Sequence, residues 1–134
     1  MNYYIADTHF GHDNIRRLSN RPFETIEEMD NTIIDNWNSR VNDNDDIYIL
    51  GDFSYKSEDP ILYLKQLIGR KHLIVGNHDG KLLKNPVCKN YFIEICDIKW
   101  LMIMERRLFV VIILWLNGMG IIEMYCIFMV IFIT

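Results

Sequence analysis

Residues 3–14 read YYIADTHFGHDN, a short apolar run that changes at Asp7 into polar side chains and a glycine. The same pattern returns twice. IYIL at 47–50 is followed by GDFSYKS, and LIV at 73–75 is followed by GNHDG. Short apolar runs bounded by turn residues predict buried strands. The polar residues after each run would then lie at one edge of a sheet, where ligands bind in layered α/β folds.

Two amphipathic segments separate these three runs. Residues 25–28 spell a capping box, and apolar residues then recur at helical spacing as far as Trp37. A second helix is expected to begin at Pro60, after the capping residue Asp59, and to stop at Gly69. Further strands are expected at 91–95 and 98–104. The alternating order of strands and helices predicts an α/β fold.

Composition limits the classes of partner. A chain of 134 residues with 24% charged residues is expected to form one folded domain rather than a disordered segment. Its net charge of -4 argues against general binding to nucleic acid or to an anionic membrane. Cys88, Cys96 and Cys126 show no paired or CxxC spacing, and the N-terminus lacks the pattern of a secretory signal. These features predict a cytoplasmic protein.

The residues that follow the strands suit a metal site. Asp7 and His9 are two positions apart, so both point to the same side of an extended segment. Asp52 follows the second strand, and Asn77 follows the third. Carboxylate oxygens combined with imidazole suit Mn, Fe or Zn, and two such ions about 3.5–4 Å apart can clamp a phosphate. Each motif alone could be an ordinary polar turn, whereas the three together predict a metal centre.

Glycine precedes two of these motifs. Gly51 comes directly before Asp52, and Gly76 comes directly before Asn77. Glycine adopts backbone conformations that other residues avoid. Both glycines are therefore expected to provide a tight bend that aims the next side chain inward.

The ordered set DTH, GD and GNHD resembles the calcineurin-like metallophosphoesterases. The longer stretches DTHFGHDNI and YILGDF are similar to a small bacterial or phage-type branch of that family, and the resemblance covers residues 3 to about 107. It implies an αββα sandwich with two divalent metal ions, Mn, Fe or Zn. It also implies hydrolysis of a phosphomonoester or phosphodiester substrate.

The resemblance assigns metal ligands residue by residue. Asp7 and His9 would bind the first ion, Asp52 would bridge both ions, and Asn77 would bind the second. The family completes its site with three more histidines, one in a motif like HYP and two in a closing GHxH. This chain has no histidine after His78. It is therefore expected to hold one ion or none, and its catalysis is expected to be impaired.

The resemblance also assigns catalytic residues. His78 would act as general acid or stabilise charge on the leaving oxygen, and Asp79 would orient His78 by a hydrogen bond. His12 is a weaker candidate for substrate contact. The arginines of the next segment are expected to form a solvated face, with contact to a substrate phosphate as the alternative. They are Arg16, Arg17 and Arg21.

The amino-acid composition changes at Leu108, after which charged residues almost disappear. Of 32 charged residues, 31 precede Leu108, and Glu123 alone follows it. Residues 1–107 are therefore expected to form the N-terminal part of the phosphoesterase domain, and residues 108–134 an aberrant apolar tail. The tail is expected to be an out-of-frame translation, caused by a natural frameshift or a sequencing error.

Codon arithmetic supports the out-of-frame hypothesis. If the third base of each codon is joined to the first two bases of the next, Met119-Gly120 and Met129-Val130 must each give glycine. The shifted frame permits HYPMAEWNG from Val111 onward and VLHFYGHIHN over residues 124–134. Both missing motifs thus become possible in the family's order.

Two alternatives for the tail stay open. A membrane span needs about 20 consecutive apolar residues, and Asn117 and Glu123 interrupt the tail before that length, so a membrane is an unfavoured partner. The tail could also be a real core β-hairpin that turns at Asn117-Gly118. The alternatives to an impaired enzyme are a non-catalytic remnant that binds metal or phosphate, and a membrane-tethered protein.

Overall fold

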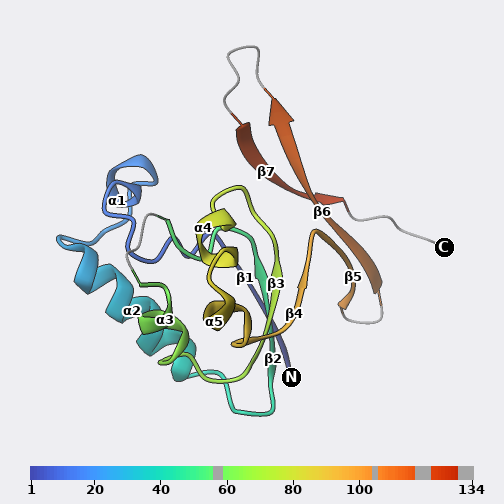
Figure 1. Cartoon of the computed structure of the whole chain (residues 1–134), viewed down its shortest axis with the longest axis horizontal. Coiled ribbons are helices and arrows are strands. Elements are labelled where there is room, and N and C mark those ends of the chain that lie inside the picture. Colours follow the sequence, from blue (N-terminus) through green and yellow to red (C-terminus); the bar gives the residue numbers. More distant parts are fainter. Residues whose placement is uncertain (56–58, 104–105, 117–121, 130–134) are drawn as a thin grey trace.

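The computed structural model of the chain describes residues 1–55, 59–103, 106–116 and 122–129. Its centre is a four-stranded parallel sheet with the strand order β1-β2-β3-β4 (Figure 1). The strands are β1 (Asn2–Ala6), β2 (Asp46–Leu50), β3 (Arg70–Ile74) and β4 (Phe92–Cys96). The predicted strands are confirmed, and β3 begins earlier than the apolar run 73–75 because Arg70 pairs in register with Asp46.

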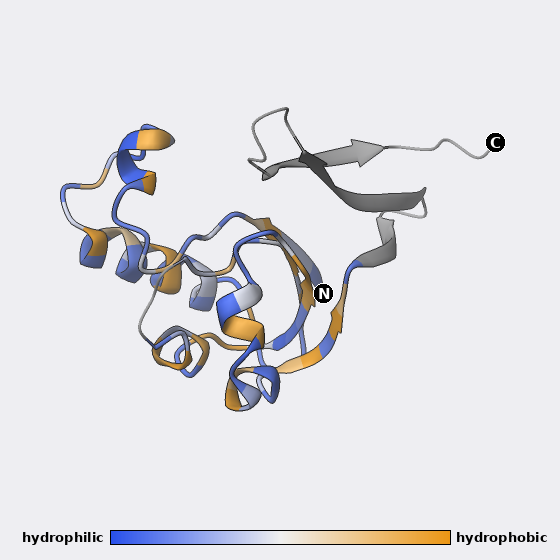
Figure 2. Ribbon diagram, turned by 45° about the horizontal axis from the view of Figure 1, so that its top comes forward, coloured by the Kyte–Doolittle hydropathy of each residue, from blue (hydrophilic) through white to orange (hydrophobic). Residues whose placement is uncertain are grey.

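Helices cover one face of this sheet (Figure 1). They are α1 (Ile15–Leu18), α2 (Ile26–Asn38), α3 (Ile61–Leu64), α4 (Gly80–Leu83) and α5 (Pro86–Lys89). The predicted cap of α2 is confirmed, because the Thr25 side chain accepts a hydrogen bond from the Glu28 amide at 3.1 Å. Along α2, hydrophobic residues alternate with hydrophilic ones from turn to turn (Figure 2), so one side of the helix can be buried.

The helix predicted to run from Pro60 to Gly69 is only one turn long in the structure. It ends at Leu64 because side chains of α2 form hydrogen bonds with backbone groups that follow it. Trp37 Nε1 donates to the Ile68 carbonyl at 2.9 Å, and Asn38 bonds both the Gln66 carbonyl and the Ile68 amide. These tertiary hydrogen bonds replace those of a continued helix.

The core lies between the sheet and the helices. Ile47, Ile49 and Leu73 of the strands meet Trp37 of α2 and Leu64 of α3 there. At relative exposures of 0–6%, these side chains have left water almost completely, and burial of each aliphatic side chain contributes about 1.5–3 kcal/mol. This core packs against the parallel strands, whose register places their carboxyl ends beside one another.

A second sheet follows the parallel one. It is antiparallel with the order β5-β6-β7, formed by β5 (Ile98–Ile103), β6 (Arg106–Leu116) and β7 (Ile122–Met129). The described residues of the expected aberrant tail lie in β6 and β7, which pair from Phe109↔Met129 to Leu116↔Ile122. The turn predicted at Asn117-Gly118 lies outside the described residues. None of the helices that the structure describes has the length and apolar character to cross a membrane.

Candidate metal centre

The segments after β1 and β2 run side by side beyond the sheet. The Asp7 amide donates to the Gly51 carbonyl at 3.2 Å, and the His9 amide donates to the Asp52 carbonyl at 3.0 Å. The Thr8 hydroxyl adds a buried bond of 2.7 Å to the Phe53 carbonyl. These bonds continue the pairing of two parallel strands into their loops and bring the DTH and GD motifs together.

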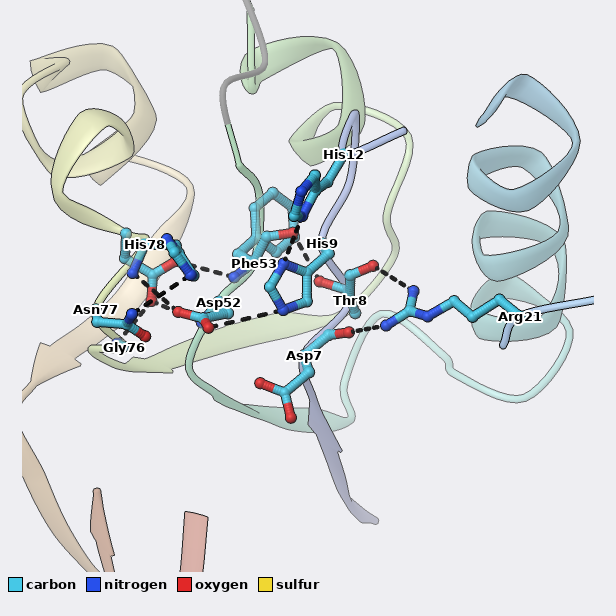
Figure 3. Close-up of polar contacts among 11 residues, drawn as sticks. Asp7, Thr8, His9, His12, Arg21, Asp52, Phe53, Gly76, Asn77 and His78 are labelled. Atoms are coloured by element: carbon cyan, nitrogen blue, oxygen red, sulfur yellow. Dashed lines mark hydrogen bonds and ion pairs between the residues drawn. The ribbon is translucent and has the colours of Figure 1, made fainter. Parts of the chain in front are cut away.

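Three residues of these loops adopt a left-handed backbone. The φ angles are 50° at Asp7, 51° at His9 and 51° at Asp52. Such a conformation costs a residue with a Cβ about 1–2 kcal/mol. It persists only where the surroundings impose it, and it often marks a functional site. Here it turns the three side chains toward one point (Figure 3).

Asp7, His9 and Asp52 form a cluster suited to a cation. Each offers one oxygen or nitrogen atom, and all of these atoms lie within 4.8 Å of one another. The His9 Nε2 atom lies 3.7 Å from Asp52 Oδ2. Two carboxylates and an imidazole that converge in this way fit Mn, Fe or Zn. The structure therefore brings together the three residues that the sequence assigned to the first ion and the bridge.

Burial shifts the pKa values of this cluster. Asp52 is only 3% exposed, and this burial raises its pKa to about 6. A hydrogen bond from the His78 amide lowers the same pKa but does not offset the burial. Burial also lowers the pKa of His9 to about 4, helped by the positive charges of His12, Arg21 and His78. At neutral pH, His9 is therefore a neutral imidazole that can bind metal, and Asp52 is mostly ionised.

The raised pKa of Asp52 contributes stability to the metal-free protein that is lost as the pH rises. Between pH 3.8, the ordinary pKa of the group, and about pH 6, Asp52 is protonated in the folded chain and ionised in the unfolded chain. The stabilisation of the folded state by this proton is therefore present near pH 4 and lost by pH 7. We expect the unfolding free energy of the wild type, minus that of Asp52→Asn, to fall by about 2–3 kcal/mol between pH 4 and pH 7.

Chemical denaturation of both proteins in EDTA measures this difference. The shift of His9 acts in the opposite direction, and the subtraction removes its contribution. A difference that stays constant or rises with pH would show that Asp52 is not a buried acid with a raised pKa.

Asn77 and His78 approach Asp52 from the end of β3. The His78 amide donates to Asp52 Oδ1 at 2.9 Å, and the Asn77 side-chain amide lies 3.2 Å from Asp52 Oδ2. With the amide nitrogen toward the carboxylate, Asn77 donates a hydrogen bond to it. With the oxygen turned to the same place, Asn77 and Asp52 would share a cation. The placement of Asn77 thus suits the role predicted for it.

Asp79 lies beneath the site and is completely buried. Its carboxylate accepts hydrogen bonds from the amides of Asp52 at 3.0 Å, Phe53 at 2.9 Å and Gly76 at 2.7 Å. Burial raises its pKa to about 6 despite these bonds. The sequence suggested that Asp79 orients His78. What Asp79 orients directly in the structure is the backbone of the GD and GNHD loops, and its charge raises the pKa of His78 against the lowering by burial.

Gly51 and Gly76 are glycines for different structural reasons. Gly51 has a φ of 78°, so the expected bend is confirmed there. Gly76 does not have a positive φ, so its backbone does not use a conformation that favours glycine. A Cβ on Gly76 would lie 2.5 Å from Asp52 Oδ1 and 2.6 Å from the Asp52 nitrogen. Glycine is needed at residue 76 because the two loops approach so closely.

His12 and Tyr55 lie beside the cluster. His12 Nδ1 is 3.2 Å from His9 Nδ1, so His12 contacts a metal-ligand candidate directly. The Tyr55 ring lies 4.3 Å from the His12 ring and 4.4 Å from the His78 ring, between ring centroids. Neither Tyr55 nor Thr8 was predicted as a site residue from the sequence, although Thr8 lies inside the DTH motif, because their contacts are with residues distant in the chain.

Comparisons of the chain with known proteins agree with this geometry. A family model described as calcineurin-like phosphoesterase matches residues 3–128. An uncharacterized protein of Methanocaldococcus jannaschii is 46% identical over 80 residues, which are 58% of this chain and 46% of that protein. The Gene 66 protein of Mycobacterium phage L5 is 37% identical over 82 residues, 58% of this chain and 39% of that protein. The chain spans less than half the length of these curated relatives.

A solved structure shows the same fold. The crystal structure of a protein of unknown function from Aquifex aeolicus has a TM-score of 0.69 and 34% sequence identity, covering 84% of this chain and 60% of that one. The family model spans both the parallel sheet and the motifs that converge beyond it. The chain therefore belongs to the calcineurin-like phosphoesterase family.

Proposed function

We propose that this chain descends from a metal-dependent phosphoesterase that hydrolyses a phosphomonoester or phosphodiester, and that its own catalysis is impaired. The observation that supports the proposal is the convergence of Asp7, His9 and Asp52 on one point. Members of the family use divalent metal ions, and the donor atoms here suit such ions. A bound divalent ion would polarise the phosphate and activate water for attack.

The site residues would have different roles in the reaction. Asp7, His9 and Asp52 would hold the first ion, and Asp52 and Asn77 would face the second. Burial lowers the pKa of His78, and an adjacent cation would lower it further. The ring would then be neutral near pH 7 and would stabilise the leaving oxygen by donating a hydrogen bond.

A second candidate function is metal or phosphate binding without turnover. The support for it is that residues 79–134 contain no histidine, so they supply none of the HYP and GHxH ligands. A single incomplete site could bind an ion and a phosphate without activating water. The same deficit predicts weak binding at the second position, which Asn77 and Asp52 alone would supply.

Metal stoichiometry and turnover test both candidates. We expect the purified chain to bind about one Mn²⁺ saturably and to hydrolyse bis(p-nitrophenyl) phosphate slowly, with activity lost in EDTA. Two bound ions with turnover would indicate a complete enzyme, and one ion without turnover would indicate the binding remnant. A chain that binds no Mn²⁺ saturably would contradict the proposed metal centre.

We also propose that residues 108–134 are an out-of-frame continuation of the domain formed by residues 1–107. The support is the loss of charge after Leu108 and the HYP and GHIHN motifs that the shifted frame permits. Sequencing the gene across codons 105–134 tests this. One inserted or deleted base that restores both motifs is expected. A reading in which no single-base change restores GHxH would contradict the proposal.

A cytoplasmic location stays a prediction. Cys88 is a free thiol among the residues described, which is compatible with a reducing compartment. Cell fractionation of the tagged chain would test this location and the membrane-tethered alternative together.

A further inference from the structure

Arg21 contacts the segment that carries two metal-ligand candidates. Its Nη1 atom donates to the Thr8 carbonyl at 3.0 Å, and its Nη2 atom donates to the Asp7 carbonyl at 2.6 Å. Figure 3 shows the guanidinium reaching both carbonyls from the side opposite Asp52. The expectation that Arg21 belongs to a solvated face is therefore wrong, since its charged end binds the backbone next to the site.

The neighbouring arginines differ from Arg21. Arg16 forms an ion pair with Asp13 and donates to the carbonyls of Phe23 and Glu24. Arg17 is exposed. Of these three arginines, Arg21 is the one with described contacts to the metal-binding segment.

The position of β1 explains why the segment needs a donor. β1 is the first strand in the sheet order, so β2 is its neighbour within the parallel sheet. The amides of Asp7 and His9 bond the β2 side. The carbonyls of Asp7 and Thr8 accept from Arg21 instead of from another strand. The planar guanidinium can bond two adjacent carbonyls at once, which a lysine ammonium cannot reproduce with the same geometry.

These bonds act where the backbone is strained. The two contacted carbonyls lie between the left-handed residues Asp7 and His9, whose side chains must point at the cation. Without Arg21, both carbonyls would lose the donor that the described residues provide for them, and the loop could relax toward an ordinary extended backbone. Relaxation would move two ligands away from Asp52.

Acidic residues balance the half-buried guanidinium. Burial lowers the pKa of Arg21, and the charges of Asp7 and Asp30 raise it. The Asp30 carboxylate also accepts from the Gly11 amide, at 3.2 and 3.3 Å from its two oxygens. Asp30 therefore supports the far end of the same loop. The charge of Arg21 itself opposes a nearby cation, so its geometric and electrostatic effects on metal affinity have opposite signs.

We propose that Arg21 is a positioning residue for the metal centre, holding the segment 7–9 so that Asp7 and His9 present their side chains to a divalent cation. The inference rests on the proposed function, because it presupposes that these residues bind metal. It predicts that the geometric effect of Arg21 exceeds its electrostatic repulsion.

Mn²⁺ binding by the full chain tests this inference. Arg21→Ala, Arg21→Lys and the exposed control Arg17→Ala are titrated, with free Mn²⁺ measured by electron paramagnetic resonance. The temperature is one at which circular dichroism shows each variant folded. We expect Arg21→Ala to weaken binding about 10- to 100-fold. Arg21→Lys keeps the charge but loses the double bond to the carbonyls, so it should also weaken binding about tenfold. Arg17→Ala should stay within about twofold of the wild type.

Thermal unfolding in EDTA separates positioning from simple stability. A purely structural role would lower the melting temperature and leave the Mn²⁺ affinity of the folded protein unchanged. Affinities of Arg21→Ala and Arg21→Lys equal to, or tighter than, that of the wild type would overturn the inference. If Arg21→Ala does not fold, Arg21→Lys decides by the same criterion. A wild-type chain without saturable binding would instead overturn the proposed metal centre, and this inference with it.

Discussion

Replacement of Asp79 by alanine should lower the free energy of unfolding by about 3–5 kcal/mol. The carboxylate is fully buried and accepts hydrogen bonds from three backbone amides. Each buried donor left without a partner costs about 1–3 kcal/mol. A loss of this size is a large part of the stability of a small domain.

The fold around the site depends on these bonds. Asp79 ties the Gly76 amide to the amides of Asp52 and Phe53, so it joins the loop after β3 to the loop after β2. Urea denaturation in EDTA measures the effect, with Asp43→Ala as the control, because Asp43 is an exposed acid in the turn before β2. A loss below about 1 kcal/mol would show that water or a rearranged loop satisfies the three amides.

Replacement of Asp52 by asparagine should weaken Mn²⁺ binding by more than about 100-fold, which is about 2.7 kcal/mol. Asp52 is common to both expected metal positions. Its carboxylate belongs to the cluster with Asp7 and His9, and the Asn77 amide lies beside it. Asparagine preserves the shape but removes the charge and one acceptor oxygen, so both positions lose their shared anionic ligand.

The same substitution should leave the metal-free chain folded. Burial disfavours the Asp52 charge, so at pH 7 in EDTA the asparagine variant should be at least as stable as the wild type. Titration with Mn²⁺ alongside Asp43→Asn separates loss of a ligand from a general loss of negative charge. Unchanged affinity in Asp52→Asn would exclude Asp52 as a ligand and would contradict the proposed bridging role.

Local patterns predicted the elements that depend on neighbours in the chain. Strands β1, β2 and β3 were visible because each contains a short apolar run that is followed by turn residues. The start of α2 was visible because its cap joins residues only three positions apart, Thr25 and Glu28. The short helices α1, α4 and α5 were not predicted, although Asn85 and Pro86 form a local start signal for α5.

Long-range contacts decided what the patterns could not. α3 is short because side chains of α2 bind residues 66–68, about 30 positions away. Gly76 is required because Asp52 approaches it from another strand. The contacts of Arg21 with Asp7 and Thr8 depend on the path of the chain between α1 and α2, which residue spacing does not encode.

By itself, the sequence determined the fold class, the family and the identity of the candidate ligands. It could do so because strand periodicity and the residue types of the DTH, GD and GNHD motifs are local properties of the chain. Only the tertiary structure decided how the supporting residues act, placing Asp79 under two loops and Arg21 against a third. The physical reason is that buried backbone groups must find hydrogen-bond partners wherever folding places them, and those partners come from distant segments.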